Sequence, residues 1–236
     1  MQKEAILITG AGQRIGLFLA EQFLAQGQPV VFTYRQDRPA VALLKSKGAI
    51  GFQVDFNDPG SLNAFLTTLP KQVHSLRAVI HNASIWVTDA QIEASPELLG
   101  ALMTVHITAP FKINQACYPL LCRSQASCAD VIAMSDARVA TGHPDYSGYL
   151  ASKAGLETLT KSLAKAWAPK VKLNILAPGL VIFNDRDTEA DRTARLAESA
   201  IPQPIGLEGI WQAIQYLMQS NTSTATRLEL GQCSRQ

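Results

Sequence analysis

The chain has 236 residues, 47% hydrophobic and 17% charged, which is enough for one large α/β domain or two small ones. Its formal net charge of +2 is near neutral and implies no broad surface for nucleic acid or anionic membrane. Only four residues precede the first apolar run, and no apolar run approaches membrane-spanning length, so we expect a cytoplasmic protein without a signal peptide. Four cysteines lack both Cys-x-x-Cys spacing and a partner His cluster, so we expect reduced thiols and no metal: Cys117, Cys122, Cys128 and Cys233.

Apolar segments of strand length alternate along the chain with segments of helical pattern. The strand-like segments cover residues 5–9, 29–34, 50–54, 76–81, 130–134, 171–176 and 226–230. The helix-like segments cover residues 14–26, 37–47, 60–69, 96–122, 146–167 and 207–219. Near-continuous apolar strands separated by helices are typical of a parallel sheet covered on both faces. We therefore predict one Rossmann-like, doubly wound α/β domain of about seven strands over residues 1–236.

One segment interrupts this alternation after the sixth predicted strand. Phe183 to Ile205 is rich in charge and proline and contains no obvious strand. Because the loops of an α/β scaffold commonly carry its binding residues, we predict a mobile substrate flap at residues 183–205. A solvated surface helix is the alternative interpretation of this segment.

The first predicted strand leads into a glycine-rich turn, which reads Thr9-Gly10-Ala11-Gly12-Gln13-Arg14-Ile15-Gly16. A strand, this turn and a helix together form the context that a dinucleotide fingerprint requires. Gly10 permits the tight turn, Gly12 lets a pyrophosphate approach the backbone, and Gly16 lets the helix pack closely on the strand. The phosphates would then rest on the helix N-terminus. An ordinary glycine-rich connection is the alternative.

Tyr149 and Lys153 lie four residues apart, and no other tyrosine of the chain has a lysine at this spacing. On a helix the two side chains share one face, one turn apart. An ammonium beside a phenol favours the phenolate, so we expect Lys153 to lower the pKa of Tyr149 and Tyr149 to transfer a proton at neutral pH.

Ligands of open α/β sheets bind beyond the carboxyl ends of the strands, where the strand order reverses. The residues that follow the predicted strands are Gly10–Gly16, Arg35, Asp55, Asn82–Trp86, Ser135, Asp136 and Pro178–Val181. Together with Tyr149 and Lys153, these motifs resemble the short-chain dehydrogenase/reductase family over essentially the whole chain. The resemblance implies a nicotinamide-dependent oxidoreductase that assembles as a homotetramer.

Three departures from the general family pattern resemble the pteridine reductases, and among them the bacterial dihydromonapterin reductases. Arg14 stands where most family members carry glycine, and Ser84 replaces the usual glycine of the motif Asn82-Ala83-Ser84-Ile85-Trp86. Asp136 stands where the family's catalytic serine is usual. The resemblance implies reduction of 7,8-dihydromonapterin to tetrahydromonapterin, with weak dihydrofolate reduction as a side activity.

The cofactor implied is NADPH, because Arg35 ends the second predicted strand where NAD-binding chains carry an acid. Guanidinium groups bind phosphate as rigid forks, although Arg35 as a solvated cap of the next helix is the alternative. The resemblance implies that Asp55 contacts the adenine, with a helix N-cap role as its alternative. The full set of expected cofactor-binding residues is Gly10, Gly12, Gln13, Arg14, Ile15, Arg35, Asp55, Asn82, Ala83, Ser84, Tyr149, Lys153, Pro178, Gly179 and Val181.

The expected substrate-binding residues are Arg14, Ser84, Trp86, Asp136 and Tyr149. A pterin is flat and stacks on an aromatic face, so Trp86 would sandwich it against the nicotinamide; a core or subunit contact is the alternative. An ionised Asp136 only accepts hydrogen bonds, which suits the amino and ring N–H groups of a pterin. A shift by one residue would restore the usual serine, Ser135.

The expected catalytic residues are Tyr149, Lys153 and Asp136, with Lys153 also bonding the nicotinamide ribose. His106 stands where the family usually has an asparagine, and a satisfied buried histidine is the favoured interpretation. The C-terminal sequence, Leu228 to Cys233, departs from the family's usual ending and bears on the tetramer contact. Two alternative functions stay open: reduction of another carbonyl substrate through Ser135, and a non-catalytic NADPH-binding regulator.

Overall fold

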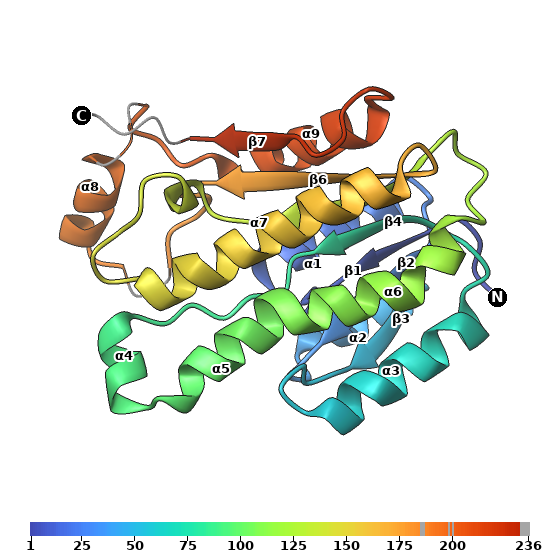
Figure 1. Ribbon diagram of the computed structural model, residues 1–236, viewed down its shortest axis with the longest axis horizontal. Helices are drawn as coiled ribbons and strands as arrows, with labels where there is room; N and C mark the ends of the chain where they lie inside the picture. The colour runs from blue at the N-terminus through green and yellow to red at the C-terminus, as the bar shows by residue number, and fades with distance from the viewer. Residues whose placement is uncertain (185–186, 198, 200, 232–236) are drawn as a thin grey trace.

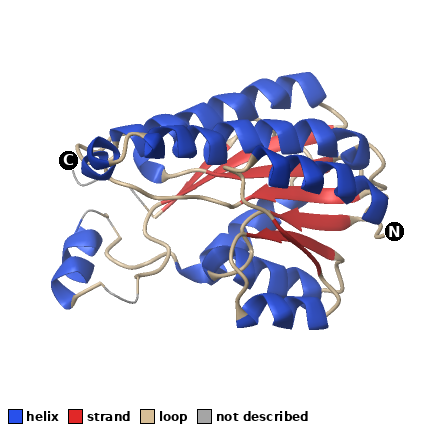
Figure 2. Cartoon of the chain, turned by 90° about the horizontal axis from the view of Figure 1, so that it is seen from below, coloured by secondary structure: helices blue, strands red, loops and turns tan. Residues whose placement is uncertain are grey.

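The fold is a seven-stranded sheet with helices on both faces (Figures 1 and 2), described by a computed structural model for all residues except 185, 186, 198, 200 and 232–236. All strands pair in parallel, in the order β3-β2-β1-β4-β5-β6-β7. The strands are β1 Ala5–Ile8, β2 Val30–Tyr34, β3 Ile50–Gln53, β4 Leu76–His81, β5 Ala129–Met134, β6 Val171–Pro178 and β7 Arg227–Leu230. The order reverses between β1 and β4. The predicted Rossmann-like sheet is confirmed.

Continuous burial explains why the strands are readable in the sequence. Every residue of β1, β2, β5 and β6 is buried, as expected for parallel strands covered on both faces. The helices that cover them are α1 Arg14–Ala25, α2 Pro39–Ser46, α3 Pro59–Gln72, α5 Glu97–Met103, α6 Ala109–Leu121, α7 Ser147–Trp167 and α9 Gly206–Gln219.

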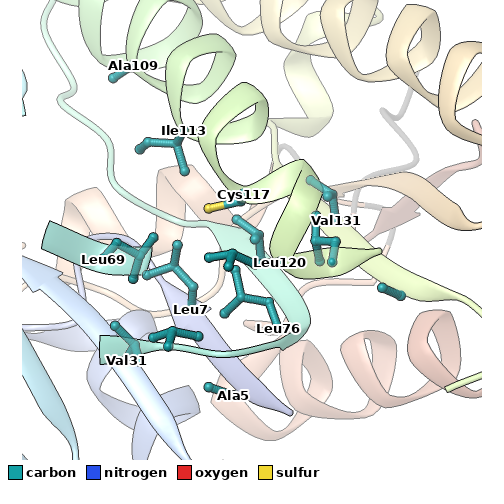
Figure 3. Close-up of a cluster of buried hydrophobic side chains, with 14 of the residues drawn as sticks. Ala5, Leu7, Val31, Leu69, Leu76, Ala109, Ile113, Cys117, Leu120 and Val131 are labelled. Carbon is teal, nitrogen blue, oxygen red and sulfur yellow. The ribbon is translucent and has the colours of Figure 1, made fainter. Parts of the chain in front are cut away.

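Two hydrophobic cores hold the helices against the sheet. On one face α3, α6 and α7 pack on the strands, and Figure 3 shows Ile113, Cys117 and Leu120 of α6 directed toward Leu7 and Val31 of the sheet. On the other face α1, α2 and α9 form the second core. Burial of this kind contributes roughly 25 cal/mol per Å² of apolar surface. The sheet is therefore a rigid base for the loops at its edges.

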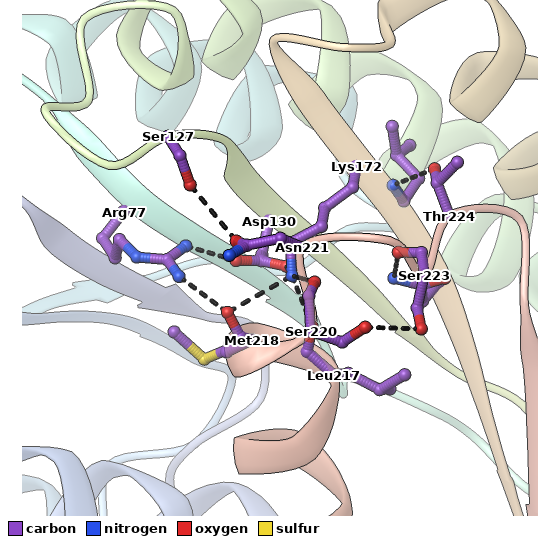
Figure 4. A network of polar contacts seen from close by, with 12 residues as sticks. Arg77, Ser127, Asp130, Lys172, Leu217, Met218, Ser220, Asn221, Ser223 and Thr224 are labelled. Carbon is purple, nitrogen blue, oxygen red and sulfur yellow. Dashed lines mark hydrogen bonds and ion pairs between the residues drawn. The ribbon is translucent and has the colours of Figure 1, made fainter.

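A buried ionic network closes the amino-terminal edge of the sheet (Figure 4). Asp130 of β5 pairs with Arg77 of β4 and, at 2.8 Å, with Lys172 of β6. The same cations donate to carbonyl oxygens at the end of α9: Arg77 to Met218 at 3.0 Å, and Lys172 to Ser220 at 2.7 Å. Cations beside a helix C-terminus also complement its dipole. We call these residues the Asp130 network.

The helix predicted over residues 96–122 is in fact three pieces. A π-helical turn, Thr104–Thr108, separates α5 from α6. The structure also contains a short 3₁₀ turn, Ala137–Val139, and the helix α4, Asp89–Ala94, neither of which was predicted. A capping box of Thr88 and Gln91 begins α4, so the sequence did carry a signal for it.

The segment predicted as a flap contains a helix, α8 Glu189–Ala197, without a buried residue. In Figure 1, α4 and α8 lie at the end of the molecule toward which β6 and β7 point. This stretch thus contains the helix of the alternative interpretation, and a substrate flap and its movement stay predictions. Cys233, at the end of the unusual C-terminal sequence, lies outside the described residues. None of the described helices is both long and apolar enough to span a membrane.

Candidate active site

A cavity of about 700 Å³ opens at the carboxyl ends of the strands. Every residue that the sequence suggested for cofactor or substrate borders it, from the turn after β1 to the segment after β6. Residues at its wall that the sequence analysis did not single out include Arg38, Arg138, His143, Tyr146, Asn184 and Arg195. The topology therefore brings the predicted motifs together at the reversal point of the strand order.

Asn82 fastens the glycine-rich turn to the end of β4. Its side-chain amide donates to the carbonyl oxygens of Thr9 and Gly10 at 3.0 and 3.1 Å. In return, the Thr9 hydroxyl accepts from the backbone N–H groups of Asn82 and Ala83, both at 3.0 Å. A Cβ on Gly16 would lie 2.5 Å from the Asn82 amide nitrogen and from the Gly10 carbonyl oxygen. Glycine at position 16 is thus required by this clasp of Asn82 and Thr9.

Arg14 begins α1 with a φ of +53°, a left-handed conformation that favours glycine. This strain explains why glycine is usual at the position. An arginine kept there despite the strain indicates a functional role for its side chain. Its guanidinium donates to the Asn184 side chain at 3.0 Å, and both residues line the cavity.

Arg35 and Asp55 border the cavity beyond β2 and β3. Asp55 accepts a hydrogen bond from the backbone N–H of Asn57 at 2.9 Å. The N-cap of α3 is Asp58, which accepts from the backbone N–H of Gly60 at 2.9 Å. Asp58 therefore caps α3, while the hydrogen bond from Asn57 to Asp55 has the N-cap-like form that the alternative describes.

Asp136, and not Ser135, meets the tyrosine hydroxyl. The Tyr149 hydroxyl donates to the Asp136 carboxylate at 3.3 Å. The Ser135 hydroxyl instead donates to Glu157 at 2.6 Å, and Glu157 is also held by Arg227 at 3.0 Å. With its hydrogen committed to a buried carboxylate, Ser135 is unsuited to polarise a substrate carbonyl.

Lys153 does not have the predicted effect on Tyr149. Its ammonium donates to the Met134 carbonyl oxygen at 2.8 Å and lies 5.8 Å from the centre of the Tyr149 ring. Burial raises the pKa of Tyr149, and the adjacent Asp136 carboxylate raises it further. The expectation that Lys153 lowers this pKa is therefore wrong: burial and the nearer carboxylate dominate. Burial also lowers the pKa of Lys153 itself to about 8.

Trp86 stacks on a partner from its own chain. Its ring lies 4.9 Å from that of Tyr146, with an interplanar angle of 19°. The Arg195 guanidinium of α8 lies 5.9 Å from the centre of the Trp86 ring, and that of Arg138 lies 5.4 Å from the Tyr146 ring. Trp86 is 46% exposed, so the alternative of a core tryptophan is wrong.

A sequence model described as short chain dehydrogenase matches residues 4–194, which include the glycine turn, Asp136, Tyr149 and Lys153. The chain belongs to this family. Members of the short chain dehydrogenase family are oxidoreductases, and the predicted family and enzyme class are thereby confirmed.

Curated relatives cover nearly the whole chain. The chain is 38% identical over 223 residues to a dihydromonapterin reductase of Klebsiella pneumoniae. The aligned region covers 94% of this chain and 93% of that protein. It is 37% identical over 215 residues to a dihydromonapterin reductase of Escherichia coli, covering 91% and 90% of the two chains.

Solved structures share the fold at lower identity. FolM alternative dihydrofolate reductase 1 from Brucella canis, complexed with NADP, superposes with a TM-score of 0.84 at 21% identity, over 96% of this chain and 92% of that one. A 4-hydroxyisoleucine dehydrogenase complexed with NADH gives a TM-score of 0.89 at 19% identity, over 98% of both chains. At these identities the likeness establishes the fold alone.

Proposed function

We propose that the chain reduces 7,8-dihydromonapterin to tetrahydromonapterin with NADPH, with weak dihydrofolate reduction as a side activity. One observation carries the proposal: the Tyr149 hydroxyl meets a carboxylate, Asp136, in a cavity that Trp86 also lines. An ionised carboxylate accepts hydrogen bonds and suits the N–H groups of a pterin, whereas a ketone oxygen needs a donor. The relatives named dihydromonapterin reductase support the same substrate.

The cofactor end of the cavity fits a dinucleotide with an additional phosphate. A Cβ on Gly10 would lie 2.8 Å from the Ala83 backbone, so only glycine lets these two segments approach. The N-terminus of α1 offers N–H groups to a pyrophosphate. Arg14, Arg35 and Arg38 line the same cavity, and guanidinium groups suit a 2′-phosphate. Two FolM structures with NADP support this choice.

The remaining cofactor contacts follow from the family. We assign the pyrophosphate to Gly12, Gln13 and Ile15, and the adenosine to Asp55, Asn82 and Ala83. Pro178, Gly179 and Val181 would flank the nicotinamide, and Lys153 would bond its ribose. Bound NADPH would supply the hydride that reduces C6 of the pterin.

The protein's own contribution is the proton for N5 of the pterin. Because burial and Asp136 raise the pKa of Tyr149, this phenol keeps its proton at neutral pH and has one to donate. The Asp136 carboxylate orients the hydroxyl from 3.3 Å. General-acid assistance of this kind accounts for roughly 10²- to 10⁴-fold in rate.

The test is oxidation of NADPH by the purified chain, followed by absorbance with dihydromonapterin, dihydrofolate and a simple ketone in parallel. We expect rapid turnover of dihydromonapterin, slower turnover of dihydrofolate and none of the ketone. NADH in place of NADPH is expected to raise KM for the cofactor. Turnover of the ketone alone would establish another carbonyl substrate, and tight NADPH binding without turnover would favour a regulator.

We propose further that the protein is a cytoplasmic homotetramer. Leu99 of α5 and Phe111 of α6 are 40% and 46% exposed, and apolar side chains of this size on neighbouring helices favour a subunit contact. Cys117, Cys122 and Cys128 are free thiols, in keeping with a reducing compartment. Light scattering coupled to size-exclusion chromatography would measure the assembly.

A further inference from the structure

A buried histidine lies directly behind the candidate catalytic residues. The π-helical turn Thr104–Thr108 carries His106, which is 1% exposed and does not line the cavity. Its ring meets that of Tyr149 edge-on, with 5.7 Å between ring centres. π-Helical turns inside helices are rare and frequently mark functional sites. Gly155 of α7 makes room for this π-helical turn, because a Cβ on Gly155 would lie 2.4 Å from the side chain of Ile107.

Both ring nitrogens of His106 have a serine partner. Nδ1 lies 2.7 Å from the Ser152 hydroxyl, and Nε2 lies 2.8 Å from the Ser84 hydroxyl. Ser152 donates its hydrogen to the carbonyl oxygen of Tyr149 at 2.6 Å. A hydroxyl has one hydrogen, so Ser152 can only accept from the histidine. Nδ1 of His106 therefore carries a hydrogen.

The direction of the next hydrogen bond follows from this tautomer. Burial, together with the charge of Lys153, lowers the pKa of His106 to about 2, so the ring is neutral and has a single N–H. Nε2 is then an acceptor, and the Ser84 hydroxyl donates to it. Two other acceptors lie near Ser84: the Ile85 carbonyl oxygen, more distant at 3.3 Å, and the Tyr149 phenol oxygen, which also shares a hydrogen bond with Ser84. Donation to either of them would leave the buried Nε2 of His106 without a partner.

We infer that His106 is a positioning residue that turns the hydrogen of Ser84 away from the cavity, so that Ser84 offers the substrate only an acceptor. Ser84 borders the cavity together with Asp136, a second acceptor. A pair of acceptors beside Tyr149 selects a substrate rich in N–H donors and disfavours a carbonyl compound, which has none. The inference rests on the proposed pterin reduction and deepens it: specificity originates in a histidine that the substrate does not touch.

The ring tautomer can be measured without any substrate. The full chain, labelled with ¹⁵N-histidine, contains four histidines, and His106→Asn identifies the signal of His106. Long-range ¹H–¹⁵N NMR is expected to show a protonated Nδ1 and a bare Nε2 from about pH 6 to about pH 9. The opposite tautomer, or a charged ring, would overturn the inference. This result does not depend on turnover, so it is separable from a failure of the proposed function.

A kinetic test changes the tautomer from a distance. Ser152 is fully buried and does not line the cavity. Ser152→Ala removes the acceptor of Nδ1, which permits the other tautomer and a Ser84 hydroxyl that points into the cavity. KM for dihydromonapterin is expected to rise roughly tenfold, with kcat within about twofold and an NMR signal shifted toward protonated Nε2.

Thr160 provides the matched control. It is buried on the same helix, and its hydroxyl donates to the Leu156 carbonyl oxygen at 2.8 Å. Thr160→Val removes an equivalent hydrogen bond that has no contact with His106, and KM is expected to stay unchanged. An equal rise of KM in both variants, or no rise in Ser152→Ala, would overturn the inference. Should Ser152→Ala fail to fold, the NMR measurement on the unaltered chain decides.

Discussion

The two edges of the sheet bury similar charges in opposite ways. At the amino-terminal edge, Asp130 is fully buried between Arg77 and Lys172. At the carboxyl edge, Lys153 is also buried, yet it donates to a carbonyl oxygen and forms no ion pair with any described carboxylate; Asp136 and Glu157 act on it only from beyond ion-pair distance. A buried cation with its counter-charge holds structure together; one without it has a shifted pKa and is available for chemistry.

The largest expected effect concerns the carboxyl edge of the sheet, where the candidate catalytic residues lie. Tyr149→Phe removes the hydroxyl that Asp136 orients and is expected to lower kcat about 10³-fold, because the proton donor is lost. NADPH affinity, measured by fluorescence titration, is expected to stay within about threefold. Full turnover of dihydromonapterin by this variant would exclude Tyr149 as the proton donor.

The second prediction concerns the Asp130 network at the amino-terminal edge of the sheet. Asp130→Asn leaves two cations without their counter-charge and is expected to lower the free energy of unfolding by about 3–5 kcal/mol. KM for dihydromonapterin should not change, since the Asp130 network lies at the far edge of the sheet. Urea unfolding measures the loss.

The exposed pair of Glu21 and Lys47, at 3.0 Å, is the matched control for Asp130. Glu21→Gln is expected to cost less than about 1 kcal/mol, because water screens exposed charges. A comparable loss in both variants would show that burial of the Asp130 network contributes nothing special.

A third prediction sharpens the contrast through pH. The pKa of Lys153 is about 8 in the folded protein, against an ordinary value of 10.5. Between these values the unfolded chain binds more protons, so this lysine makes the free energy of unfolding rise with pH. Below about 8 the penalty for the buried charge is fully present. Urea unfolding across this window should show a smaller rise in Lys153→Met, and parallel curves would contradict the assignment.

The smallest expected effect concerns Arg14. Arg14→Gly relieves the left-handed backbone at a φ of +53° and is expected to raise the free energy of unfolding by about 1 kcal/mol. KM for the dihydropterin should rise at the same time, because a guanidinium that lines the cavity is lost. A variant that loses stability would show that the contact with Asn184 outweighs the strain.

The sequence was sufficient wherever one local pattern decides the outcome. Continuous apolar runs located the strands, and the glycine turn and the pair Tyr149 and Lys153 pointed to the cavity that they line. The π-helical turn was missed because residues 96–122 keep a helical pattern through it. The stacking of Trp86 on Tyr146 was not predicted because the two residues are 60 positions apart in the sequence (146 − 86 = 60). The pKa of Tyr149 was wrong because burial and the distance to Asp136 are properties of the packed molecule.

The clasp of Asn82 and Thr9 has a consequence for how this protein can be altered. It ties the turn that would receive the cofactor to the loop that begins with Ser84 and leads to Trp86. These two segments are one mechanical part, although more than 60 residues separate them in the sequence. Exchanging the turn for that of another dehydrogenase would therefore also displace the loop. The two segments must be exchanged together to preserve the specificity for cofactor or for substrate.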